Sequence, residues 1–209
     1  MTFKQRTGGV EKSGKPAPAS GNPLVERNDL AVLSEYQRQL KFGNMPEIVS
    51  SLKSYPEDVV FLGTFLKDAE TTVRWRAARC LSSAALEMDI SAALPALINA
   101  LSDPDVKTDA GKALENAISN DKNRENALDS LLRALLDPDR AIWQRAFDIL
   151  AKAAETGDHD TRVSLTNAII SYIETPIFTG EAERNSVLYV EMFGYLQQII
   201  DKLQIKEAV

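Results

Sequence analysis

The sequence predicts an all-α fold, an α-solenoid of stacked antiparallel helix pairs with capping helices at both ends. Three observations support this prediction. Short apolar patterns of helical period follow one another along the chain, and helix-breaking residues separate them. The alternation of apolar and polar residues that marks half-buried strands is absent. A unit of about 34 residues recurs three times, and repeats of this length are typical of stacked helical arrays.

Length and composition place the chain among folded proteins that need neither disulfides nor metal. It has 209 residues, of which 44% are hydrophobic and 26% charged, with a single Cys and a single His. One Cys cannot form an internal disulfide, and one His cannot supply a site built from several histidines. No apolar run approaches the ~20 residues of a membrane-spanning helix, and the N-terminus lacks the apolar stretch of a signal peptide. We therefore expect a cytoplasmic location, with the nucleus as an alternative, and no membrane contact.

Residues 1–27 form a basic tail rich in Gly and Pro. They carry five basic and two acidic side chains, a charge of +3, so the rest of a chain of net charge −6 carries −9. Because the tail holds almost no large apolar residues, it cannot bury enough surface to offset its ordering entropy, and we predict disorder. It is either a solubilising tail or a basic arm that engages an acidic partner or the acidic body.

The helical repeat domain is predicted over residues 28–205. Gly43 and Pro56 end the first two helices, whose sequences do not match the repeat that follows. The predicted parts are N-terminal capping helices at 29–56, repeats at about 57–88, 90–120 and 122–156, and a C-terminal helix pair at 159–205.

Three aligned segments define the repeat. Each begins with a short apolar helix, continues through an Asp-containing turn, and ends in a helix that carries a branched residue, an Ala and a Leu at intervals of four. The turn residues Asp68, Asp103 and Asp137 recur at intervals of 35 and 34 residues. The triplets are Val73, Ala77 and Leu81; Val106, Ala110 and Leu114; and Ile142, Ala146 and Leu150.

The repeated residue types have a physical reason. A spacing of four places each triplet on one stripe of its helix, and the central Ala lets paired helices approach to about 8 Å. We expect each turn Asp to cap the second helix, and Pro104 and Pro138 to lie in its first turn. Each pair exposes an apolar face that only a neighbouring pair can cover, so the pairs must stack.

This pattern resembles the HEAT-repeat family, especially its short HEAT-like repeats. The stretch ALPALINALSDPDVKTDAGKAL, residues 93–114, carries the likeness most clearly, and the resemblance covers about 58–154. The Arg that the family places after the branched residue is matched by Arg74, with Lys107 and Trp143 in the other two units. A tetratricopeptide unit lacks support because its Trp and Gly-Tyr pattern is missing, and an armadillo unit would need a third helix.

Some proteins similar to this family are enzymes, and their requirements can be compared with this chain. The deoxyhypusine hydroxylases use repeated His-Glu pairs to bind iron, which a chain with one His cannot supply. The alkylpurine DNA glycosylases use a basic concave face, whereas the body of this chain carries −9. No residue indicates the activity of the bilin lyases, which share short repeats of this type.

The last predicted helix, at about 181–203, holds more large apolar residues than a terminal cap requires. One interpretation is that the helix packs across the end of the stack. The other is that it forms a homodimer or partner surface, because exposed apolar patches usually mark contacts.

No catalytic, cofactor-binding or metal-binding constellation is predicted. Cys80 lies on or beside the buried stripe of its helix, and no nearby His is available to activate it, so we expect a buried structural thiol. His159 is expected in a solvated loop or as a capping residue. The glycines form neither a P-loop nor a dinucleotide-binding motif.

One cluster of basic and aromatic residues is the candidate partner-binding site. Its members are Arg74, Trp75, Arg76 and Arg79 on one helix, and Trp143 and Arg145 two repeats later. They are either interface anchors on the inner face or part of an ion-pair ladder between repeats. In the ladder, the alignment places Arg76, Asp109 and Arg145 in one row, and Arg79, Lys112 and Asp148 in another.

The expected function is that of a non-enzymatic scaffold or adaptor that binds a protein or peptide along its inner helices. The alternative is a small HEAT-like enzyme or enzyme subunit, of a lyase or nucleic-acid repair type. A deep pocket with polar groups around Trp75 and Trp143 would favour the enzyme. The acidic body argues against a nucleic-acid partner.

Overall fold

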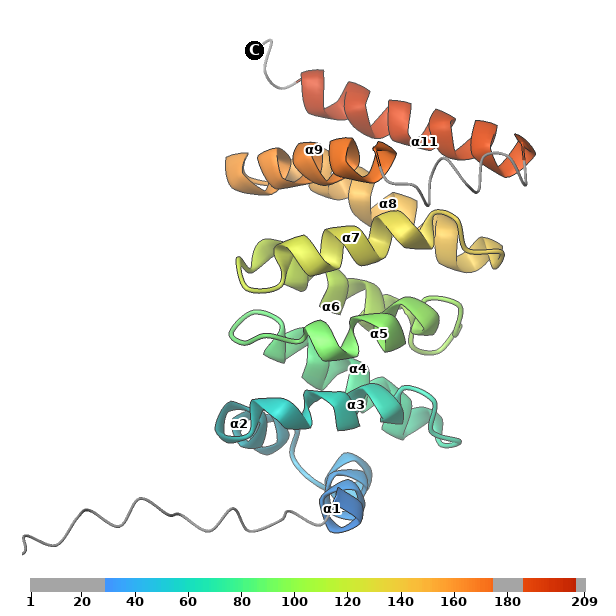
Figure 1. The fold of residues 1–209 in the computed structure, drawn as a ribbon. Coiled ribbons are helices and arrows are strands. Elements are labelled where there is room, and N and C mark those ends of the chain that lie inside the picture. The colour runs from blue at the N-terminus through green and yellow to red at the C-terminus, as the bar shows by residue number, and fades with distance from the viewer. Residues whose placement is uncertain (1–28, 175–185, 206–209) are drawn as a thin grey trace, which may run out of the picture.

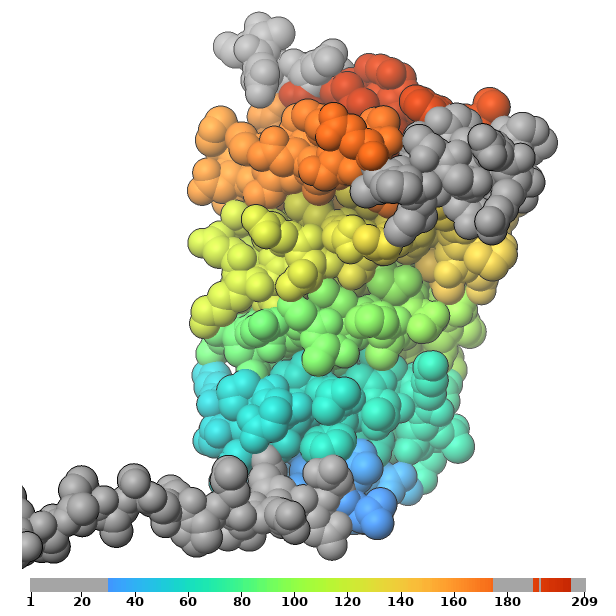
Figure 2. All heavy atoms as spheres, in the orientation of Figure 1, coloured from blue at the N-terminus to red at the C-terminus, as the bar shows by residue number. Residues whose placement is uncertain are grey.

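The computed structural model describes residues 29–174 and 186–205, and within these ranges the chain is helical and contains no strand. The helices stack in successive layers from α1 to α11, with α3, α5, α7 and α9 on the near side and α4, α6 and α8 behind them (Figure 1). The layers follow one another in chain order in the space-filling view (Figure 2). The fold is the predicted all-α solenoid with capping helices. The predicted disordered tail, residues 1–27, lies outside the described residues.

Each predicted repeat is a pair of helices joined by a short turn. We call α4, α6 and α8 the inner helices and α3, α5 and α7 the outer ones. The N-terminal cap is α1 (Asp29–Phe42) and α2 (Met45–Ser54). The repeats are α3 (Val59–Phe65) with α4 (Thr71–Ala84), α5 (Leu94–Ala100) with α6 (Lys107–Ser119), and α7 (Arg124–Ala134) with α8 (Arg140–Thr156). Single turns of 3₁₀ helix, Pro56–Asp58 and Ser91–Ala93, precede α3 and α5.

The core runs along the whole stack and contains the three triplets. All nine triplet side chains are buried, and the most exposed of them, Ile142, is only 5% exposed. Small residues at Ala77, Ala110 and Ala146 lie between larger ones, which allows the helices of each pair to pack closely. The stripe that the periodicity predicted is therefore the buried face of each inner helix.

The predicted role of the turn aspartates is wrong in detail. Their Oδ1 atoms accept hydrogen bonds of 2.8–2.9 Å from the backbone N–H two residues further on, which closes an Asx turn before the helix begins. The side chain that caps α8 is that of Asp139, which accepts from the N–H of Ala141. Pro104 and Pro138 also precede α6 and α8 and do not lie in their first turns. The turns are longer than expected by two or three residues.

Asn123 joins the loops on the other edge of the stack. It is fully buried, and its Nδ2 donates to the carbonyl oxygens of Ala85 and Met88 at 3.1 and 2.7 Å. Its Oδ1 accepts from the N–H of Ile90 at 2.7 Å. One side chain therefore satisfies three backbone groups of the preceding loop.

The C-terminal pair is α9 (His159–Ile173) and α11 (Ser186–Ile205), and the segment between them lies outside the described residues. Leu196, Ile199 and Leu203 of α11 are buried where this helix packs against α8 and α9. The interpretation that the helix packs across the end of the stack is confirmed. Val190 is 69% exposed on α11, and a homodimer through this helix stays a prediction. None of the described helices is long and apolar enough to cross a membrane.

Candidate functional site

Four of the six candidate partner-binding residues lie on α4. Two of these, Arg74 and Arg76, already bind other parts of the chain. The guanidinium of Arg74 joins the first repeat to the second, with Nε 2.7 Å from Asp103 Oδ2 and Nη2 3.3 Å from Asp105 Oδ2. Its Nη1 also donates to the backbone oxygens of Asp68 and Ala69. The side chain is only 17% exposed, and its donors are already occupied by its own turn and by the next repeat.

Arg76 is occupied in a similar way at the N-terminal cap. Its Nη1 donates to the carbonyl oxygens of Leu40, Lys41 and Gly43 at 3.0, 3.4 and 3.3 Å. These carbonyls lie at the C-terminal end of α1, where they have no partner within the helix. A cation at this end also stabilises the helix dipole, so Arg76 fastens α1 to α4.

The half-buried Trp75 and the exposed Arg79 form a pair on the inner helix α4. The guanidinium carbon of Arg79 lies 4.9 Å from the centroid of the Trp75 ring, a cation–π contact. Arg79 Nε lies 4.0 Å from Asp109 Oδ1 on α6. The predicted ladder that placed Arg76 opposite Asp109 is therefore wrong, because Arg76 turns back to α1 and Arg79 approaches Asp109 instead.

Trp143 contacts the C-terminal cap. Its ring centroid lies 4.9 Å from that of Tyr195 on α11, and the ring of Phe147 lies 4.8 Å from Tyr195. The half-buried Trp143 therefore helps to hold α11 against α8. It does not line the groove described next, and neither does Trp75.

Arg145, the sixth candidate, lines a groove between the inner helices α6 and α8. The groove consists of two adjoining cavities of about 470 and 240 Å³ that share part of their lining. We call it the α6–α8 groove. The shared residues are Lys112, Glu115, Ile149 and Lys152; the larger cavity adds Lys107, Thr108, Asp109, Gly111, Arg145 and Asp148, and the smaller adds Ile118, Ser119, Ala153, Thr156, Gly157, Asp158 and Thr161.

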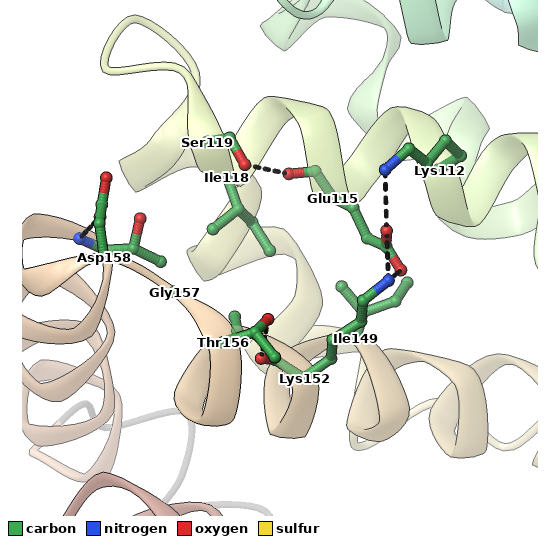
Figure 3. A pocket seen from close by; sticks show the side chains of 11 residues that line it. Lys112, Glu115, Ile118, Ser119, Ile149, Lys152, Thr156, Gly157 and Asp158 are labelled. Atoms are coloured by element: carbon green, nitrogen blue, oxygen red, sulfur yellow. Dashed lines mark hydrogen bonds and ion pairs between the residues drawn. The ribbon is translucent and has the colours of Figure 1, made fainter. Parts of the chain in front are cut away.

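An ion pair crosses the groove where the two cavities meet. The carboxylate of Glu115 on α6 lies 2.8 Å from Lys152 Nζ on α8 and 3.3 Å from Lys112 Nζ on its own helix (Figure 3). The apolar side chains of Ile118 and Ile149 also line the groove, Ile149 beside these charges and Ile118 to one side of them, near Ser119 (Figure 3). The groove is therefore lined by both charged and apolar side chains.

One end of the groove is closed by a tight turn into α9. Asp158 caps α9 by accepting from the N–H of Thr161 at 2.8 Å, and this hydrogen bond lowers the pKa of the Asp158 carboxyl. A Cβ at Gly157 would overlap the carbonyl oxygen of Ala153 and the side chain of Thr161, so the turn requires glycine. This turn, Gly157 and Asp158, separates the end of α8 at Thr156 from the start of α9 at His159.

Of the residues that line the groove, Arg145 was a predicted site residue, and Asp109, Lys112 and Asp148 were predicted only as members of the ladder. The available signal was Gly111, since a glycine in the middle of a helix lowers helix propensity and often marks a packing feature. An ideal Cβ at Gly111 would have Ile149 Cδ1, at 3.8 Å, as its nearest neighbour. The glycine therefore widens the groove and contributes no side chain to it.

Cys80 and His159 do not line the groove. Cys80 is fully buried on α4, and burial raises the pKa of its thiol to about 12, as expected for a structural thiol. His159 is exposed in the first turn of α9, so the expectation of a loop position is wrong by one residue, because α9 begins there. Across the two described ranges, no group of three or more His, Cys, Asp or Glu residues could hold a metal ion.

Comparison with known proteins gives no family. No family model matches the sequence, and no curated protein matches it. Among solved structures, two engineered proteins from a structural genomics consortium align at 17% and 20% identity, covering 88% and 86% of this chain and 83% of each of theirs, with TM-scores of 0.41 and 0.40. A designed armadillo repeat protein in complex with a (KR)4 peptide aligns at 18% identity over 84% of this chain and 83% of its own, with a TM-score of 0.40.

Proposed function

We propose that the protein is a non-enzymatic scaffold or adaptor that binds a peptide or a peptide-like segment of another protein in the α6–α8 groove. The proposal includes a HEAT-like character of the repeats, which is supported by the three aligned segments and by the contacts of Arg74 with the next repeat. A cytoplasmic location remains part of the same proposal.

The observation that carries this proposal is the form of the groove. It consists of two adjoining cavities between the inner helices, lined by the apolar side chains of Ile118 and Ile149 and by charged side chains. Grooves of this composition suit extended or helical segments, whose backbone and side chains offer both kinds of contact. Trp75 and Arg79 extend the surface on α4 through the contact of Arg79 with Asp109. Neither Trp75 nor Trp143 lines the α6–α8 groove.

The proposal is tested by blocking the groove. We expect that peptides selected from a displayed random library on the full-length protein bind the Gly111→Ala variant as well as the unchanged chain, but lose binding to Gly111→Trp, whose side chain fills the larger cavity. Titration calorimetry measures the affinity, and circular dichroism confirms that both variants remain folded. Selected peptides that bind Gly111→Trp unchanged would place the binding surface elsewhere and contradict the proposal.

A further inference from the structure

The charges on the two walls of the α6–α8 groove alternate in sign and oppose one another. The repeat alignment sets Asp109 of α6 level with Arg145 of α8, and Lys112 level with Asp148, in the wider cavity. Charges three residues apart on each helix lie on the same side, so each wall presents both signs to the groove. The walls are complementary and could close as a ladder of ion pairs.

Among the described residues, an ion pair joins the two walls at one end of this ladder only. Glu115 and Lys152 form this pair, with 2.8 Å between the carboxylate oxygen and Nζ. The charged side chains of the wider cavity do not pair across the groove among the described residues. Lys112 contacts Glu115 on its own helix at 3.3 Å, and Asp109 faces Arg79 of α4 at 4.0 Å.

Two opposite charges on α8 are consequently left open to a ligand. Arg145 and Asp148 line the cavity of about 470 Å³, and neither has an ion-pair partner among the residues that the structure describes. Arg145 is half-buried and Asp148 is exposed. Their three-residue spacing corresponds to a rise of about 4.5 Å along the helix.

We propose that the α6–α8 groove selects an extended peptide that carries an acidic and a basic side chain two residues apart, the acid against Arg145 and the base against Asp148. In an extended chain, residues i and i+2 point to the same side and lie about 6.6–6.8 Å apart. This is longer than the rise of about 4.5 Å between Arg145 and Asp148, and long, flexible charged side chains can bridge the difference. This inference rests on the proposed function, because it names the chemistry of the segment that the groove would bind.

The balance of charge favours a mixed peptide over a uniformly charged partner. A run of acidic residues would bring like charges against Asp148 and Asp109 as well as opposite charge against Arg145. A run of basic residues would bring like charges against Arg145 and Lys112. Like charges in close contact disfavour the wrong partner, so the walls act against both uniform sequences. A nucleic acid has uniform negative charge, so it would be repelled by the acidic groups of the groove and also by the rest of a chain whose net charge is −6.

The first test compares four labelled peptides of equal length by fluorescence anisotropy with the full-length protein. The probes are repeats of Glu-Ser-Lys-Ser, with both charges on one side; Glu-Ser-Ser-Lys, with neighbouring opposite charges on opposite sides; and all-Glu-Ser and all-Lys-Ser chains. We expect Glu-Ser-Lys-Ser to bind more tightly than each of the others by up to about thirtyfold, since two exposed ion pairs at about 0.2–1 kcal/mol each contribute at most about 2 kcal/mol together.

The second test inverts one charge at a time. Arg145→Glu makes the α8 wall acidic and is expected to shift the preference to the all-Lys-Ser peptide, and Asp148→Lys is expected to shift it to the all-Glu-Ser peptide. The matched control is Arg140→Glu, which makes the same change of charge on α8 outside the groove lining and should leave the preference unchanged. Circular dichroism confirms the fold of each variant.

The outcomes separate this inference from the proposed function. Equal binding of all four peptides, or preferences that Arg145→Glu and Asp148→Lys do not shift, overturns the mixed-charge inference. In that case the function still stands if Gly111→Trp abolishes the binding of peptides from the random library, and it falls if Gly111→Trp abolishes none. A single-stranded oligothymidylate that binds more tightly than Glu-Ser-Lys-Ser, with loss of binding in Arg145→Glu, overturns the inference in favour of a nucleic acid.

Discussion

The junction between α4 and α6 and the junction between α6 and α8 join the same kind of helices, but they are held by different side chains. At the first junction, Asn116 Nδ2 donates to the carbonyl oxygen of Ser82 at 2.8 Å, and Asn120 Nδ2 donates to that of Ala85 at 2.9 Å. Across the second junction, the long side chains of Glu115 and Lys152 meet above the groove.

The difference shows how the reach of a side chain sets the distance between repeats. An Asn side chain is short, so it reaches a backbone carbonyl of the neighbouring inner helix only when the two helices lie close together. A Lys and a Glu together bridge a wider gap and leave space beneath them, which here is the α6–α8 groove. The loops follow the same division, because Asn123 binds three backbone groups of the preceding loop whereas Asp158 caps its own helix.

The largest expected effect tests the closed junction. Asn123→Ala leaves the carbonyl of Met88 and the N–H of Ile90 without their buried partner, while the carbonyl of Ala85 keeps its hydrogen bond from Asn120. We expect the free energy of unfolding to fall by about 2–4 kcal/mol, because each unsatisfied buried group costs about 1–3 kcal/mol and water can reach some of them after the change. Urea denaturation followed by circular dichroism measures the loss.

Asn126→Ala is the matched control for this change. Asn126 lies one turn further along α7 and is exposed, with a single hydrogen bond to Ser91 Oγ at 2.8 Å. Its loss should cost well under 1 kcal/mol. Equal effects of the two substitutions would mean that the loops do not hold the first junction, and the contrast between the junctions would lose its main support.

The two faces of α6 provide the second prediction. Ala110 is fully buried, so Ala110→Leu should overpack the helix pair and lower the free energy of unfolding by about 1–3 kcal/mol. Gly111 faces the groove, where a Cβ meets only Ile149 Cδ1 at 3.8 Å, and its backbone φ is not positive. Gly111→Ala should therefore raise the free energy of unfolding by about 0.5–1 kcal/mol through better helix propensity.

The same denaturation experiment measures both variants. A cost at both positions would show that α8 lies as close to α6 as α5 does and that the groove closes in solution. Unchanged stability in Ala110→Leu would contradict the assignment of the buried stripe. A loss of stability in Ala110→Leu together with a gain in Gly111→Ala is expected only if one side of α6 is packed and the other is open.

The repeats could be predicted because their determinants are local and periodic. Val106, Ala110 and Leu114 define one buried stripe whatever the helix packs against, and the turn residues mark where each helix stops. The contacts of Asn123 were not predictable, because its partners lie 33–38 residues away and the loop must first be placed. The Asx turns were missed because an Asp before a helix is compatible with either a cap or a turn.

The site was predictable only in part, for a related reason. A basic or aromatic residue on an inner helix has several partners within reach, and the sequence does not determine which it contacts. Arg76 turns to the carbonyls of α1, and Trp143 turns to Tyr195 of α11. The groove depends on the separation of α6 and α8, which the packing of several elements sets together and which has no local signal except Gly111.

The smallest expected effect compares neighbouring residues that face the two junctions. Asn116→Ala removes a half-buried hydrogen bond at the closed junction and should cost about 0.5–1.5 kcal/mol. Glu115→Gln removes the ion pair across the groove and should cost about 0–1 kcal/mol, because Lys152 is 55% exposed and Gln can still accept a hydrogen bond. Urea denaturation in low salt and in ~0.5 M NaCl distinguishes them, since screening should abolish only the effect of Glu115→Gln. If Glu115→Gln costs more than Asn116→Ala at both salt concentrations, the ion pair is the stronger connection, and the groove is held as firmly as the closed junction.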